Sequence, residues 1–180
     1  MKRFLKNFSS QIYLYIAWIV LSTMFWGWIF NLVTDTVPAK KITVFIEGES
    51  VEETELSVKL EEKLPEGIKM AQVHSFSYAF FDSQNLLKAD VFIVKASNIE
   101  QYSDSFAPLP AELLSDGFEF SEKDSVKYGI KVYDAATKTG ILKQYAEFGD
   151  EDCYLFLGAD SVHLEDGAAL FAAKRLLSIG

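Results

Sequence analysis

The chain has 180 residues, of which 49% are hydrophobic, and this is enough for one ordinary domain and one additional apolar segment. The part after Thr34 holds all 26 acidic residues but only 14 basic ones, which gives it a formal charge of −12. A part this acidic repels phosphate groups, which argues against binding of nucleic acid and against lying flat on anionic lipid.

The longest uncharged stretch of the chain predicts a membrane span. Between Lys6 and Asp35 no side chain is formally charged, and most of the stretch is apolar. At about 1.5 Å per helical residue, it reaches across a hydrocarbon core of about 30 Å. We therefore predict a transmembrane helix over residues 12–34 and a linker over residues 35–40. A cleaved signal peptide is the alternative, but its apolar region is normally only about 7 to 15 residues long.

The charges on either side of this stretch predict its orientation. The N-terminal flank is purely basic and the other flank is mixed: Lys2, Arg3 and Lys6 precede the stretch, and Asp35, Lys40 and Lys41 follow it. Basic residues are enriched on the cytoplasmic side of membrane helices, so residues 1–11 are predicted to be cytoplasmic. Residues 41–180 then form an extracytoplasmic domain that is attached to the cell membrane by a single pass.

The first elements of this domain are predicted to alternate between strand and helix. Residues 41–46 are rich in β-branched and aromatic side chains, as expected of a central strand. Ser50 and Glu53 have the spacing of a capping box, which predicts a helix that runs to Leu64. A second strand is predicted over residues 68–73. Strands separated by helices are typical of a parallel sheet, so we expect an α/β fold with a mainly parallel sheet.

The middle of the domain is predicted to hold the most deeply buried strand. Residues 86–89 are expected to end a short helix, before the apolar run of residues 90–94, which is typical of a strand covered on both faces. Ser97 and Glu100 repeat the capping-box spacing and predict another short helix. Residues 116–124 are interpreted as an irregular acidic excursion.

The last third of the chain is predicted to end the sheet and cover it. Residues 126–133 and 140–148 flank a turn and are expected to pair. The apolar residues 154–157 predict the last strand, and residues 166–179 predict a closing helix with one apolar side.

Three segments resemble part of a known family. They are residues 41–47 with the helix that follows, residues 89–98 with the sequence ADVFIVKASN, and residues 154–161 with the closing helix. Together they resemble the first lobe of the extracellular solute-binding proteins of ABC importers, also called periplasmic binding proteins. The resemblance implies a three-layer α/β/α lobe outside the membrane. Family members close two lobes around a solute, whereas residues 97–153 are too short for a full second lobe.

Polar residues near the predicted strand ends are the candidate ligand-binding residues. In open parallel sheets, ligands gather beyond the carboxyl ends of the strands. The candidates at these ends are Glu49, Ser75, Tyr78, Ser97, Asn98 and Asp160. The alternative is that Ser97 only caps a helix and that the others line solvated loops.

No combination of residues predicts an enzyme or a cofactor site. Cys153 is the only cysteine and lies in an apolar run, as is typical of a buried strand residue. His74 and His163, the only histidines, show no spacing typical of a catalytic triad or a metal site. We therefore expect no catalytic residue, metal or cofactor. The predicted function is a membrane-anchored domain that binds a protein partner or docks onto a membrane complex. The alternative is a solute or peptide receptor associated with an ABC transporter.

Overall fold

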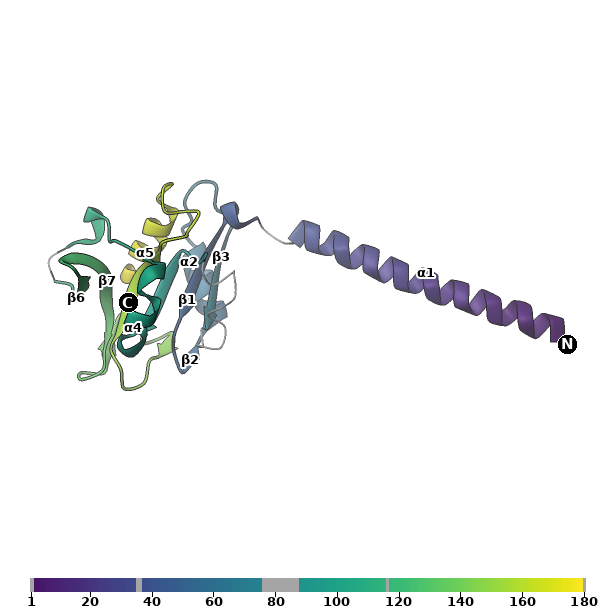
Figure 1. Cartoon of the computed structure of the whole chain (residues 1–180), viewed down its shortest axis with the longest axis horizontal. Helices are drawn as coiled ribbons and strands as arrows, with labels where there is room; N and C mark the ends of the chain where they lie inside the picture. Colours follow the sequence, from purple (N-terminus) through teal and green to yellow (C-terminus); the bar gives the residue numbers. More distant parts are fainter. Residues whose placement is uncertain (1, 35–36, 76–87, 116, 180) are drawn as a thin grey trace. The chain divides into compact units, whose positions relative to one another are not determined.

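The computed structural model describes residues 2–34, 37–75, 88–115 and 117–179, and the side chains of residues 12–30 within the first helix. It divides the chain into two compact units, Met1–Val37 and Pro38–Gly180. The first unit is the helix α1, Lys2–Thr34, drawn in purple in Figure 1. Its segment Ile12–Phe30 is long and apolar enough to cross a membrane. A membrane anchor and a signal helix both fit this finding.

The second unit is an α/β domain built on a mixed sheet (Figure 1). Three parallel strands form one side of the sheet: β3 (Met70–Ser75), β1 (Lys41–Ile46) and β4 (Val91–Lys95). The sheet continues beside β4 with three antiparallel strands: β10 (Cys153–Gly158), β7 (Val126–Asp134) and β6 (Phe120–Lys123). The sheet is therefore mixed, with parallel pairing among β3, β1 and β4 and antiparallel pairing from β4 to β6.

Four very short strands complete the strand pairing in the described residues. The strand β5 (Phe106–Ala107) pairs with β10, and β8 (Thr139–Gly140) pairs with β7. A separate ribbon joins β2 (Ser50–Val51) to β9 (Ala146–Glu147). The predicted pairing of residues 126–133 with 140–148 is confirmed only at its turn, where Tyr133 faces Gly140.

Two expectations about the antiparallel half were wrong. The strand expected at residues 154–157 is present as β10, but it runs antiparallel to β4. An apolar run buried on both faces is identical in either direction, so its composition carries no information on orientation. The segment 116–124, expected to be irregular, contains the strand β6, which forms a hairpin with β7.

Three helices accompany the sheet among the described residues: α2 (Glu53–Glu61), α4 (Ile99–Tyr102) and α5 (Ala168–Ser178). Single 3-10 turns are η1 (Pro38–Lys40), η3 (Ala96–Asn98), η4 (Ser103–Ser105) and η5 (Ala111–Leu113). The closing helix is confirmed as α5. Of the residues 86–89 expected to end a short helix, only Lys88 and Ala89 are described, and neither is helical.

Neither predicted capping box forms. Ser50 pairs with Glu147 in the β2–β9 ribbon, and α2 begins later, after Glu52 and without a side-chain cap. The helix α4 begins after Asn98, again without a side-chain cap. At the first position the Ser50 backbone pairs with Glu147, and at the second the Asn98 side chain bonds to Glu47.

The domain has two apolar clusters, on opposite faces of the sheet. Successive strand residues point to opposite faces, so Ile93 belongs to one cluster and Phe92 to the other. The larger cluster is covered by α2 and α5, which contribute Leu56, Leu60 and Leu176. The smaller, aromatic cluster is covered by the segment around α4. Figure 1 shows α4 drawn in front of the sheet.

The helix α2 seals the outer edge of the sheet. The strand β3 is an edge strand, and three of its outward N–H groups donate to side chains of α2 rather than to another strand. Ser75 donates to Glu53 (2.6 Å), Val73 to Ser57 (3.0 Å), and Ala71 to Glu61 (3.1 Å). The three acceptors are four residues apart on one helix face, which matches the two-residue spacing of the donors along the strand.

Candidate functional site

The domain of residues 38–180 has a groove on the aromatic face of the sheet. It has a volume of about 720 Å³ and lies between the segment α4–η4 and the β6–β7 hairpin. Its lining combines carboxylates with aromatic and aliphatic side chains: Ile99, Glu100, Ser103, Asp104, Phe106, Ser121, Glu122, Lys123, Asp124, Tyr128 and Phe156. We refer to these residues as the α4–β6 groove.

The floor of the groove is aromatic because a glycine leaves room for a ring. Phe106 and Phe156 are stacked with ring centroids 3.9 Å apart. A Cβ atom at Gly129 would lie 2.5 Å from Cε1 of Phe156, so only glycine allows this ring to lie against the backbone of β7. Both phenylalanines are buried, whereas Ile99 and Tyr128 are half-buried at the groove.

The walls of the groove are acidic. Glu100 and Asp104 come from one wall, and Glu122 and Asp124 from the other, and all four side chains are exposed. Lys123, the only cation of the lining, donates from Nζ to Ser103 Oγ (3.4 Å) and so spans the two walls.

The hairpin wall is set by a tight turn between β6 and β7. Asp124 and Ser125 both adopt positive φ, 52° and 65°. Two consecutive left-handed residues in a two-residue loop form a type I′ turn, which matches the right-handed twist of the paired strands. The turn places Lys123 and Asp124 at the end of the hairpin, beside η4.

Most of the sequence-predicted candidates are structural or lie apart from this groove. Asn98 Nδ2 donates to Oε1 of the buried Glu47 (2.5 Å), and Lys95 N donates to its Oε2 (2.9 Å). The Glu47 carboxylate therefore ties the end of β1 to the chain after β4. Ser97 is exposed beside this tie, on η3.

The remaining candidates do not gather with them as expected. Ser75 donates its backbone N–H to Glu53 at the sealed edge, and Glu49 donates its own to Glu147 O (2.7 Å). Asp160 lies at the opposite end of the sheet from these residues, because it follows β10, which is antiparallel to β4. Tyr78 lies outside the described residues. None of the other five candidates lines the α4–β6 groove.

No known protein family, curated protein or solved structure matches this chain. Its function is therefore argued from its own residues. Among the described residues, no three His, Cys, Asp or Glu side chains are placed to hold a metal ion. Cys153 is buried in β10, as expected, and burial raises the pKa of its thiol to about 12, so it is not a reactive thiolate at neutral pH.

A hydrogen-bonded chain of polar groups lies at the other end of the sheet, beside the start of the domain at Pro38. The buried His163 places Nδ1 2.8 Å from Asp166 Oδ2 and Nε2 3.1 Å from the Pro38 carbonyl oxygen. Its backbone N–H donates to Ser161 Oγ (3.0 Å), which in turn donates to Asp90 Oδ1 (2.5 Å). Both ring nitrogens face acceptors, so the protonated imidazole, with two donors, satisfies both contacts.

This arrangement predicts that His163 makes stability depend on pH. Burial alone would lower the pKa of His163, but the Asp166 hydrogen bond, the Asp90 charge and the Pro38 carbonyl together raise it. Because the folded-state pKa is raised, the stabilisation is complete below the unfolded pKa of about 6.5 and is lost as pH rises through the folded pKa. We expect the loss to be about 1–2 kcal/mol, the size of one charge-assisted hydrogen bond.

Thermal unfolding of residues 37–180 between about pH 6 and pH 8 measures this effect. His163→Gln should flatten the dependence of stability on pH in that range. His74→Gln, which changes the other histidine, should keep the pH dependence of the parent. If stability of His163→Gln depends on pH as strongly as that of the parent, His163 is not the source of the dependence.

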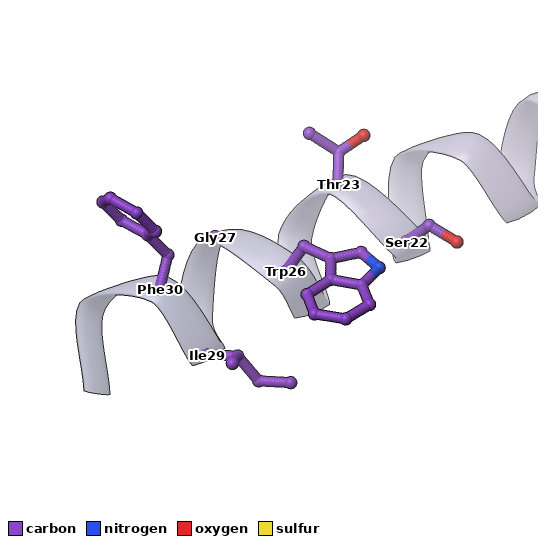
Figure 2. A pocket seen from close by; sticks show the side chains of 6 residues that line it. All are labelled: Ser22, Thr23, Trp26, Gly27, Ile29 and Phe30. Atoms are coloured by element: carbon purple, nitrogen blue, oxygen red, sulfur yellow. The ribbon is translucent and has the colours of Figure 1, made fainter. Parts of the chain in front are cut away.

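A second hollow lies on α1 and is shown in Figure 2. It is lined by residues of this helix alone: Ser22, Thr23, Trp26, Gly27, Ile29 and Phe30. Gly27 leaves a gap in the helix surface, and the Thr23 hydroxyl donates to the Ile19 carbonyl (2.8 Å), so the polar group is satisfied within the helix. Such a surface can pack lipid or another helix, but it has no opposing wall to enclose a ligand.

The sequence reasoning missed the α4–β6 groove. Its two walls are about twenty residues apart in sequence, and they meet only because the β6–β7 hairpin pairs with β10. One local signal was present: Phe118 and Phe120 alternate with polar residues, and a two-residue polar loop, Asp124-Ser125, precedes the next strand.

Proposed function

We propose that this chain is a non-enzymatic, membrane-anchored protein whose domain of residues 38–180 lies outside the membrane and binds a protein partner. The α4–β6 groove carries the proposal, because it combines an aromatic floor with charged walls on one open surface. Interfaces between proteins typically have an apolar centre and a polar rim. The apolar helix α1 supports attachment to the membrane, where the partner is then a membrane protein or a transporter.

The proposal includes a reduced solute-binding lobe as the fold of the outer domain. The last elements of the chain support it, since β10 returns beside β4 and α5 packs on the same sheet. In this proposal the segment around α4 forms the third layer, opposite α2 and α5.

A membrane-impermeant, amine-reactive cross-linker added to cells without their cell wall tests the proposal. Lys123 is exposed within the groove and offers an amine to the reagent. We expect the full chain to be recovered covalently joined to one specific membrane protein. Neutralising one wall with Glu100→Gln and Asp104→Asn should reduce this adduct strongly.

The matched control neutralises two exposed carboxylates elsewhere, Glu55→Gln and Glu66→Gln, and should leave the adduct unchanged. A domain that the external reagent never labels would refute the orientation. A domain that is labelled but joined to no partner would refute partner binding.

The second candidate is a solute or peptide receptor, and the size of the groove favours it. Its volume of about 720 Å³ is within the range of about 300–1,000 Å³ found for small-molecule sites. A protein that is purified from membranes without a partner but with a bound small molecule would support this candidate over the first.

A further inference from the structure

Two clusters of polar groups in the described part of the domain are already satisfied within the chain. At the β3 edge, the outward N–H groups bond to Glu53, Ser57 and Glu61. At the ends of β1 and β4, the Glu47 carboxylate is bonded to Lys95 and Asn98. The α4–β6 groove differs, because its four carboxylates are exposed.

The carboxylates of the groove have no cation partner in the part of the chain that the structure describes. Glu100, Asp104, Glu122 and Asp124 form no ion pair within 4.0 Å, in contrast to Asp152, whose carboxylate is 2.8 Å from Lys131 Nζ. Lys123 is the single cation of the lining, and its Nζ contacts the Ser103 hydroxyl rather than a carboxylate. The walls therefore leave an excess of negative charge around an aromatic floor.

The chemistry that complements this lining is a cation on an apolar stem. A Lys or Arg side chain can lay its methylene groups on Ile99 and Tyr128 while its charged end reaches the walls. Aromatic rings also attract such cations directly. The same hairpin already shows this contact, since Lys127 Nζ lies 4.0 Å from the centroid of the Phe120 ring.

We propose that the α4–β6 groove binds an extended segment of the partner protein that carries Lys or Arg side chains. The groove is open between two separate walls, so a chain can pass along it, and Lys123 shows that an ammonium group reaches from one wall to the other. Charge complementarity favours this occupant over an acidic peptide or a phosphate-bearing lipid, both of which the walls repel. The inference rests on the proposed function and names the chemistry of the partner.

Fluorescence anisotropy with the full chain in zwitterionic nanodiscs tests it with three labelled peptides of equal length. The first has the sequence Gly-Leu-Arg-Tyr-Lys-Leu-Gly, and the other two replace its Arg and Lys by Gln or by Glu. We expect the basic peptide to bind about tenfold more tightly than the Gln peptide, and the Glu peptide not to bind. Glu100→Gln with Asp104→Asn should weaken the basic peptide about fivefold, and Glu55→Gln with Glu66→Gln should not.

Any one of the following results would overturn the proposal. Equal binding of the three peptides removes the charge requirement, and equal weakening by both double variants shows only general attraction to an acidic domain. Competition by free arginine amide at the concentration of the peptide shows a small-amine site instead of a docked segment. If no peptide binds while the cross-linked partner persists, the partner binds elsewhere and the proposed function stands without this inference.

Discussion

A fragment of residues 37–180 should unfold in one cooperative thermal transition, and Val91→Asp should abolish it. Val91 has no exposed surface and lies in β4, between Val44 of β1 and Leu157 of β10. An unpaired carboxylate at this position would cost several kcal/mol. That is a large part of the about 5–15 kcal/mol that stabilises a typical domain. Circular dichroism during heating measures the transition, and starting at residue 37 retains the Pro38 carbonyl that contacts His163.

Val126→Asp provides the matched control for this variant. Val126 is 40% exposed at the start of β7, so its carboxylate would stay hydrated and the fragment should melt like the parent. The assignment of β4 as the buried centre is wrong if Val91→Asp melts like Val126→Asp. A disordered parent fragment would show that the domain depends on the N-terminal helix.

Gly158→Ala should destabilise the domain of residues 38–180 by about 3 kcal/mol, which lowers Tm by roughly 10 °C for a domain of this size. The added Cβ would overlap the backbone carbonyl oxygen of Ala89, at the point where Gly158 N donates to Asp90 O (3.0 Å). A backbone carbonyl has no rotamer with which to move aside, and Ala89 lies just before β4. The strands β4 and β10 would have to separate, and calorimetry of the fragment measures the loss.

Gly67→Ala separates this clash from the general effect of adding a methyl group to a glycine. Gly67 has a φ of 94° and no atom within 4 Å of its virtual Cβ, so the substitution adds only left-handed strain. We expect a loss of about 1 kcal/mol there. Equal losses at the two positions would contradict the close approach at Gly158.

The strands of this domain were predictable where composition alone specifies them. Residues 41–46, 90–94 and 154–157 are apolar or β-branched, and each lies within an observed strand or one residue of it. Direction was not predictable for β10, because the composition of a buried strand is the same whichever way the strand runs in the sheet. The expected crevice depended on that direction, so Asp160 was wrongly grouped with residues such as Asn98.

Local helix signals failed where distant partners compete for the same groups. Ser50 and Glu53 have capping-box spacing, yet the Ser50 backbone pairs with Glu147 and the Glu53 carboxylate accepts from Ser75 N–H. These partners are distant in sequence, so no window around residue 50 contains them. The α4–β6 groove escaped prediction for the same reason, since its two walls are joined only through the sheet.

The sealed β3 edge matters for a domain that is present in many copies on one membrane. In the proposed anchored state, many copies of the domain share one surface, and their encounters are frequent because diffusion is confined to two dimensions. An open edge strand would then act as a template for strand addition between copies. With Glu53, Ser57 and Glu61 occupying the outward N–H groups of β3, neighbouring copies find no donors to pair with at this edge. The domain can therefore be crowded without strand addition at the β3 edge.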